Sequence, residues 1–182
     1  MVTLIADGKR MSQPIKIVMD PRVKTPKAAL EQQYSLSMKC YRGLNEIFGT
    51  IRQIRALRNR IQALSAGVSD AALKDSLSSL DKKLKSWKGD GVPDMEDLAY
   101  ISVDGADSVK ETFNGLQTKL LYLMLSVQSA DVKPTSVQTA SFRKEEQVFK
   151  GIMNMWKSFL ATGLNQINTE LKSHGLEALT IE

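Results

Sequence analysis

Residues 30–64, LEQQYSLSMKCYRGLNEIFGTIRQIRALRNRIQAL, contain the pattern that decides the fold. Apolar side chains recur here at steps of three or four residues, and the series is Leu30, Tyr34, Met38, Tyr41, Leu44, Ile47, Ile51, Ile54, Leu57, Ile61 and Leu64. This spacing places the side chains on one face of an α-helix. Thr25 and Pro26 fit the N-cap and the first helical position, and Gly67 fits the end. We therefore predict a long helix over about 26–66.

Two shorter segments continue the same periodicity. The first predicts a helix over about 69–88, capped by Ser69 and followed by Gly89, with the apolar series Leu73, Leu77, Leu80, Leu84 and Trp87. The second predicts a helix over about 106–129, with the series Val109, Phe113, Leu116, Leu120, Leu123 and Val127. Residues 89–105 lie between them and are rich in Gly, Asp and Pro, which predicts a long connection.

The last segment predicts a second long helix, over about 135–174. Thr135 and Gln138 form a capping-box pattern, in which each side chain bonds the free backbone N–H of the other residue. Gly175 is the residue type expected just past a helix end. Together the four segments predict an all-α fold. It is an antiparallel four-helix bundle, with two long outer helices and two shorter ones.

The helix lengths predict that one end of this bundle is thin. At 1.5 Å per residue, the outer helices are each about 60 Å long and the shorter ones about 28 and 36 Å. We expect the start of the first helix and the end of the last helix to form a two-helix pair there. It would be covered by the N-terminal strands, by residues 89–105 or by a partner domain. The candidate docking surface at this end consists of Leu30, Tyr34, Tyr41, Leu164, Ile167 and Leu171.

The first residues have β-strand character. Residues 2–5 are β-prone, and Asp7 and Gly8 favour a hairpin turn because both central positions of a type I′ turn need positive φ. Residues 15–19 predict the second strand. A lone hairpin is at best marginally stable in water. It therefore either folds against the helices or consists of the last strands of a β-sandwich, and the second interpretation is favoured.

The β-prone start and the helical periodicity that follows it predict two parts. These are a hairpin over 1–24, the remnant of a preceding β-sandwich, and a helical bundle over 25–182. The N-terminal residues lack the pattern of a signal peptide. No run of 18 apolar residues occurs, so we expect no transmembrane segment.

The composition argues against most catalytic chemistry. The 182 residues include one cysteine, Cys40, and one histidine, His174, which excludes an internal disulfide, thiolate-rich metal sites and most catalytic triads. We interpret Cys40 as a packing residue. Glycine-rich phosphate-binding loops are lacking, so we predict no cofactor and no enzyme activity. An alternative enzyme hypothesis uses the carboxylates Asp94, Glu96 and Asp97.

One stretch concentrates positive charge. The chain has 25 Lys and Arg against 20 Asp and Glu, a net charge of +5, and four arginines lie close together: Arg52, Arg55, Arg58 and Arg60. These side chains either bind an anionic partner or form a solvated helix face that pairs with Asp or Glu on the second helix. The second interpretation is favoured. Base-stacking aromatic residues are not interleaved with the arginines, which makes nucleic acid an unlikely partner.

Four motifs occur in a recognisable order: VMDPRV at 18–23, IRxIR at 51–55, KPT at 133–135 and LNxINxxL at 164–171. In this order they resemble the C-terminal region of large bacterial proteins built on sortilin-like, bacterial-neuraminidase-repeat β-propellers. Those proteins are often labelled glycosyl hydrolases. In that family a β-sandwich follows the propeller, and its last strand enters an Asp-Pro-Arg turn that leads to a helical bundle.

The resemblance implies an exported, extracytoplasmic parent protein, periplasmic or secreted, whose propeller chemistry lies outside this chain. The expected function is that of a non-catalytic structural or interaction module, with the preceding β-sandwich and propeller as partners and self-association as a further expectation. We expect the chain to be a fragment or a stand-alone copy of such a tail. The alternative is a free-standing basic helical protein that binds an acidic partner through its arginine stripe.

Overall fold

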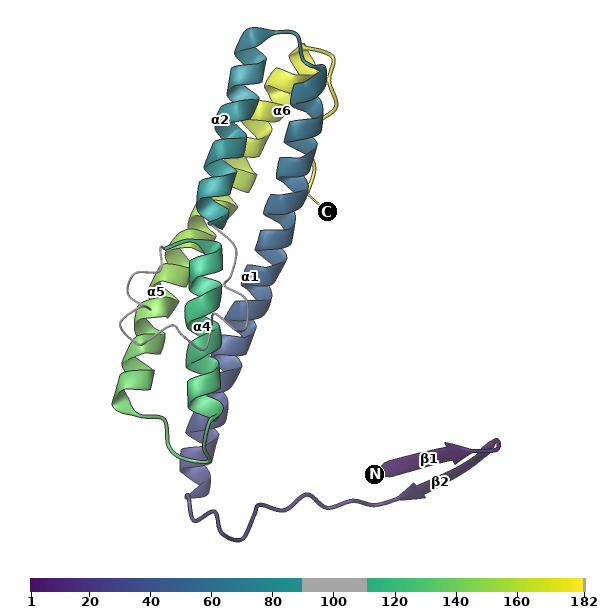
Figure 1. Cartoon of the computed structure of the whole chain (residues 1–182), viewed down its shortest axis with the longest axis vertical. Coiled ribbons are helices and arrows are strands. Elements are labelled where there is room, and N and C mark those ends of the chain that lie inside the picture. Colours follow the sequence, from purple (N-terminus) through teal and green to yellow (C-terminus); the bar gives the residue numbers. More distant parts are fainter. Residues whose placement is uncertain (90–110, 182) are drawn as a thin grey trace.

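The computed structural model of the chain describes residues 1–89 and 111–181, which form a mainly helical protein with an N-terminal β-hairpin (Figure 1). The hairpin consists of β1 (Val2–Ala6) and β2 (Lys9–Gln13). The helices are α1 (Lys27–Gly67), α2 (Ala71–Lys88), α4 (Phe113–Gln128) and α5 (Ser136–Ser158). α5 continues through one π-helical turn, η2 (Phe159–Gly163), into α6 (Leu164–Ser173). The prediction of a hairpin followed by mainly helical structure is confirmed.

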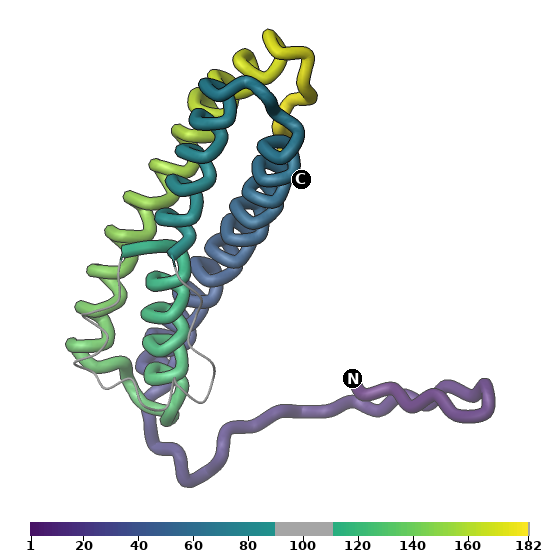
Figure 2. The backbone as a smooth tube through the Cα atoms, turned by 45° about the horizontal axis from the view of Figure 1, so that its top comes forward, coloured from purple at the N-terminus to yellow at the C-terminus, as the bar shows by residue number. Residues whose placement is uncertain are grey.

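The two shorter helices follow one another along α1 instead of lying side by side (Figures 1 and 2). α4 begins where α2 ends, and the Asn114 Nδ2 donates a hydrogen bond to the backbone oxygen of Gly89 at 3.0 Å. Both helices run opposite to α1, whereas α5 and α6 run in the same direction as α1. Within the described ranges, α4 therefore lies beside the first part of α1, and α2 lies beside its second part.

This arrangement corrects the predicted thin end. The start of α1 lies beside the end of α4, where the Gln33 Nε2 donates to the backbone oxygen of Val127 at 2.7 Å. The end of α1 lies beside the segment that follows α6, where Arg60 donates to the backbone oxygen of Thr180 at 2.9 Å. The start of α1 and the end of α6 are thus at opposite ends of the bundle.

Helix length explains the arrangement. α1 is about 61 Å long, whereas α2 and α4 are about 27 and 24 Å. Two short helices placed in succession cover the apolar face of α1 along most of its length. Side by side they would leave about half of that face in water, at a cost of roughly 25 cal/mol for each Å² of apolar surface. The core therefore extends along the whole of α1, from Leu36 to Ile61.

The local signals at the ends of the last helix are confirmed, whereas the N-cap of α1 is Pro26 and not the predicted Thr25, whose hydroxyl donates to the backbone oxygen of Asp131 instead. Thr135 and Gln138 form the capping box, with hydrogen bonds of 2.9 and 3.1 Å. Gly175 has a φ of 72°, and the N–H of Leu176 donates to the oxygen of Leu171 at 3.0 Å, as in a Schellman motif. α2 is capped by Asp70, which accepts from the N–H of Leu73 at 2.8 Å. The prediction of Ser69 as this cap is off by one residue.

The hairpin has the predicted turn but a different second strand. Asp7 and Gly8 have φ values of 48° and 71°, and Ala6 pairs with Lys9. A two-residue turn makes the second strand begin at once, and Pro14 lacks the N–H that would extend the pairing. The predicted strand over 15–19 is therefore wrong. The hairpin lies away from the bundle, and every residue of both strands is exposed (Figure 2).

The segment after α6 folds back against the bundle, which the periodicity did not predict. Leu179 is buried in the core, at 2% exposure. The Asn168 side chain fixes its backbone from both sides: Nδ2 donates to the oxygen of Leu179 at 2.9 Å, and Oδ1 accepts from its N–H at 2.7 Å. These contacts join residues 179–180 to α6, and the Arg60–Thr180 hydrogen bond joins them to the C-terminal end of α1.

Candidate functional site

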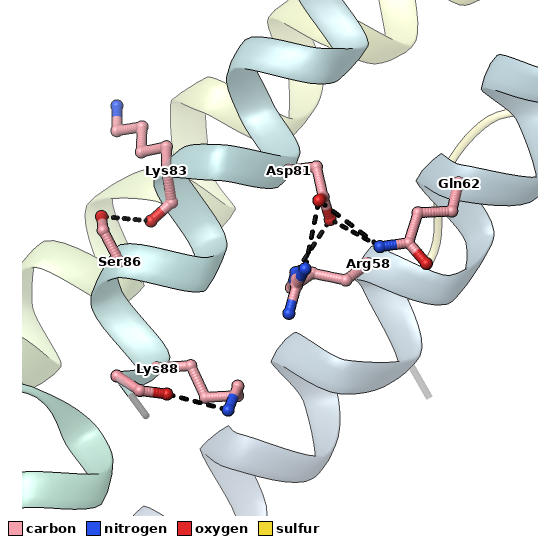
Figure 3. A network of polar contacts seen from close by, with 7 residues as sticks. Arg58, Gln62, Asp81, Lys83, Ser86 and Lys88 are labelled. Atoms are coloured by element: carbon pink, nitrogen blue, oxygen red, sulfur yellow. Dashed lines mark hydrogen bonds and ion pairs between the residues drawn. The ribbon is translucent and has the colours of Figure 1, made fainter. Parts of the chain in front are cut away.

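The arginine stripe divides into two pairs with different surroundings. Arg58 Nε and Nη2 donate to the two carboxylate oxygens of Asp81 on α2, at 2.8 and 3.1 Å (Figure 3). Arg60 bonds to Thr180, as described above. Arg52 and Arg55 are exposed, and neither side chain makes a hydrogen bond or an ion pair with the described residues. The predicted pairing with a carboxylate on the second helix is confirmed for Arg58.

The Arg58–Asp81 pair links α1 to α2 in a partly buried setting. The two side chains are 18% and 21% exposed. The hydrogen bond from Arg58 holds the pKa of Asp81 below its ordinary value of 3.8, against the opposing effect of desolvation. Gln62 lies 3.4 Å from both oxygens of the same carboxylate and supports its ionised form.

We expect Arg58→Ala to lower the free energy of unfolding by about 1–2 kcal/mol near neutral pH, because Asp81 loses a bidentate, charge-assisted partner. The pKa of Asp81 is lowered in the folded state. The stabilisation is therefore complete above the ordinary pKa of 3.8 and is lost as the pH falls through the folded-state pKa. Urea unfolding of both proteins over a range of pH should show the difference shrinking in acid. Arg143→Ala, at an exposed arginine on α5, is the control and should change stability by less than about 0.5 kcal/mol. A difference that persists in strong acid would contradict this account.

The structure separates the residues of the predicted docking surface. Leu164, Ile167 and Leu171 lie in the core on α6, each at most 9% exposed. Tyr34 and Tyr41 lie on α1 at the opposite end and are exposed. Leu30, near the start of α1, is half-buried. The prediction that all six residues form one surface is wrong, because α1 and α6 run in the same direction.

An exposed row of aromatic rings on α1 takes the place of that surface. Tyr34, Tyr41 and Phe48 are 68%, 49% and 47% exposed and are separated by seven residues each. The buried face of α1 passes instead through Leu36 and Cys40. Both tyrosines belong to the periodic apolar series of residues 30–64, whereas Phe48 does not. The seven-residue spacing of the three rings is the signal that would have identified the row.

The N-terminal segment forms a second exposed apolar surface. In the hairpin, Leu4 pairs with Met11, and both side chains are more than half exposed. Four apolar residues of the segment that connects β2 to α1 are also exposed: Ile15, Ile17, Val18 and Met19. Ile17 is 91% exposed, an unusual environment for isoleucine.

A third feature surrounds the π-helical turn. The side chains of Trp87 and Trp156 each lie 5.5 Å from the ring of Phe159. Phe159 covers Gly163, and a Cβ atom at position 163 would lie 2.7 Å from the Phe159 ring. Beside this turn is an open cleft of about 340 Å³, lined by Ser79, Leu80, Lys83, Phe159, Gly163, Gln166, Ile167 and Glu170.

The charged groups of this cleft are held by contacts within the chain. Lys83 Nζ lies 5.0 Å from the centre of the Trp87 ring, and Glu170 accepts a hydrogen bond from the Ser76 hydroxyl at 3.1 Å. The lining residues do not combine a nucleophile with a histidine, cysteine or carboxylate base positioned to activate it. The cleft is therefore an open depression, with Phe159 in its lining, that holds no recognisable reaction centre among the described residues.

The buried titratable groups are also placed for packing. Cys40 is fully buried, and desolvation raises the pKa of its thiol to about 11, so it is a poor nucleophile at neutral pH. Glu145 is only 7% exposed, because it faces α4 and lies 3.9 Å from Lys119. Its neighbour Glu146 pairs with Lys150 at 3.3 Å on the surface.

Three further findings bear on function. The carboxylates of the enzyme hypothesis, Asp94, Glu96 and Asp97, lie outside the described residues. In the part of the chain that the structure describes, no group of three potential metal ligands is present, and none of the helices could cross a membrane. Comparison of the chain with protein-family models, curated proteins and solved structures found no match.

Proposed function

We propose that this chain is a non-catalytic helical module that works by structural contact, and that its hairpin joins the sheet of a preceding β-sandwich domain. The parent would be an exported, extracytoplasmic protein of the sortilin-like propeller kind. The observation that carries the proposal is the hairpin itself, since all ten of its strand residues are exposed. The motif order described above supports the choice of parent.

The low intrinsic stability of the hairpin favours a partner. A two-stranded sheet with no packed face is at best marginally stable, so a partner that covers the Leu4 and Met11 face would stabilise it. The connecting residues 14–26 contain no Gly or Ser, and they include the apolar residues Ile15, Ile17, Val18, Met19 and Val23, which also favours burial against a partner.

The two edge strands of the hairpin differ in charge and in proline content, and this difference indicates which of them pairs with a partner strand. β1 has the sequence VTLIA and carries no charged side chain. β2 carries Lys9 and Arg10 and is followed by Pro14, features that discourage strand pairing. We therefore assign the outer edge of β1 as the edge to which a strand of the sandwich adds.

The non-catalytic part of the proposal rests on the reactive side chains. The sole cysteine is buried with a raised pKa, and Arg58 is held in a structural ion pair. The alternative function, binding of an acidic partner by the arginine stripe, retains only two exposed guanidinium groups, Arg52 and Arg55. We therefore place it second.

Hydrogen exchange and a deletion variant test the proposal. In the isolated chain we expect the β1 and β2 amides to exchange as in an unfolded peptide, while the buried part of α1 is protected. Deleting residues 1–20 should shift the melting temperature by less than about 2 °C. Deleting residues 178–182, the matched control, should lower it clearly because Leu179 is lost from the core. Protected hairpin amides together with a large loss of stability on removing residues 1–20 would contradict the proposal, since the hairpin would then belong to the module's own core.

A further inference from the structure

The outward face of α1 is one continuous surface with two chemically different halves. Its N-terminal half carries the aromatic row of Tyr34, Tyr41 and Phe48. At 100° per residue, Arg52 and Arg55 fall within about 60° of these rings and continue the same face. α2 and α4 pack against the other side of the helix, which holds the buried residues. The aromatic row therefore lacks a covering element among residues 1–89 and 111–181.

We propose that this face binds the same face of a second copy of the chain, with the two α1 helices antiparallel. Apolar residues repeated at seven-residue spacing on a helix are typical of one seam position of a coiled coil. Tyr34, Tyr41 and Phe48 occupy one seam position, and the residues four further on occupy the other: Met38, Asn45 and Arg52. A seam of this kind packs against another long helix. The α1 helix of a second copy of the chain is long enough to cover all of its layers.

The antiparallel alignment makes the seam self-complementary. In antiparallel coiled coils, each residue of one seam position packs in a layer with a residue of the other position. In one antiparallel alignment every seam residue has a partner from the other position. The pairs are Tyr34 with Arg52 of the partner subunit, Met38 with Phe48 of the partner subunit, and Tyr41 with Asn45 of the partner subunit, and two-fold symmetry repeats each pair. Each ring then meets a flexible or smaller side chain. The arginine can lie over the tyrosine face in a cation–π contact.

The charged residues that occupy the end layers of the seam support the same alignment. Glu31 is exposed and one turn from Tyr34, and its contact within the chain is a surface pair with Lys27 at 3.7 Å. The alignment that joins Tyr34 to Arg52 of the partner subunit also places Glu31 next to Arg55 of the partner subunit. A parallel arrangement would instead bring each arginine beside its own copy, and like charges across an interface are unfavourable.

The size of the surface sets the expected affinity. An aromatic side chain buries about 150–250 Å², so the exposed parts of the three rings supply about 300–400 Å² per protomer. Met38, Asn45 and the arginine stems raise the total for two protomers to about 1,000–1,200 Å², the lower limit for a specific interface. Aromatic residues and arginine are also the types enriched in interface cores. We therefore expect a weak, reversible dimer with a dissociation constant in roughly the micromolar range, because an interface at this lower limit leaves little free energy beyond the cost of association.

Sedimentation equilibrium of the full chain, from about 1 to 500 µM, tests the interface. We expect a monomer–dimer equilibrium, and the double variant Tyr41→Ser with Phe48→Ser should weaken it by about 30-fold or more. Val137→Ser, at an exposed apolar position on α5, is the matched control and should leave the equilibrium unchanged. Circular dichroism confirms that the helices persist. A monomer at the highest concentration, or a dimer that persists in the double variant, would overturn the proposal.

Charge reversal tests the alignment with changes at exposed positions only. Glu31→Arg should weaken the dimer by about tenfold, and adding Arg55→Glu should restore it to within about threefold, because the pair re-forms with its signs exchanged. Failure of this rescue would overturn the antiparallel alignment. Leu4→Ser with Met11→Ser removes the apolar face of the hairpin and should leave the dimer intact. If this variant abolishes association and the α1 variants do not, the interface belongs to the hairpin and the proposal is wrong.

Discussion

Trp156→Ala is expected to lower the free energy of unfolding by about 3–5 kcal/mol, the largest loss we predict for a single substitution. The indole is 2% exposed and stacks on the Phe159 ring at a centroid distance of 5.5 Å and an interplanar angle of 29°. Phe159 in turn meets Trp87 at 77°, so the three rings connect the last helix to the end of α2. Truncation leaves a cavity at this junction, and the rigid helices around it can collapse only in part.

Urea unfolding followed by circular dichroism measures this loss, and Trp87→Ala is the matched control. Trp87 is half-buried and retains contact with solvent, so its truncation should cost about 1–2 kcal/mol. Trp87 also remains as the sole tryptophan fluorophore in the Trp156 variant and provides an independent probe. Equal costs at the two positions would show that the cluster is not organised around Trp156.

Leu179→Ala is expected to cost about 2–4 kcal/mol, although the residue lies outside every helix. Its side chain is 2% exposed, and Asn168 bonds to both backbone groups of the residue. Those backbone hydrogen bonds hold the segment in place after truncation. The fixed backbone should therefore keep the surrounding residues from relaxing into the cavity. The loss of unfolding free energy should then be that of a leucine truncated in the core.

The measurement is again chemical unfolding, with Glu177→Ala as an exposed neighbour that should change stability by less than about 0.5 kcal/mol. Asn168→Ala should reproduce part of the Leu179 effect, since it removes both hydrogen bonds without changing the buried leucine. If Leu179→Ala were as mild as Glu177→Ala, the segment after α6 would not belong to the folded core in solution.

Local patterns predicted the helices well because their causes are local. The three-to-four spacing, the capping box at Thr135 and the glycine at position 175 each depend on neighbours within one or two turns. The order of α2 and α4 along α1 depends instead on contacts far apart in sequence. The long connection after Gly89 permits either a return beside α2 or a continuation along α1, and local patterns do not distinguish the two.

The candidate surfaces also divide into features that local sequence predicts and features that depend on packing between distant segments. Arg58 was expected to pair with a carboxylate of the second helix because the two helices are joined by a short turn. Tyr34 and Tyr41 fit the apolar spacing, but a helix packed on part of its circumference buries a limited arc. Cys40 and Leu36 occupy that arc and leave the tyrosines exposed. Leu179 had no periodic neighbours, so periodicity could not have identified it.

The π-helical turn η2 adds one residue to the last helix and so sets which side chains beyond it face the core. Its buried side chains pass from Phe159 to Leu164, a step of five where an unbroken α-helix would use three or four. One additional residue rotates everything beyond it by about 100° around the helix axis. The rotation occurs at the level where Trp87 marks the end of α2, which is where the helix exchanges one packing neighbour for another. Natural variation in this segment should therefore preserve its length even where the residues change. Loss of a single residue would turn Ile167 and Leu171 toward water without altering any side chain.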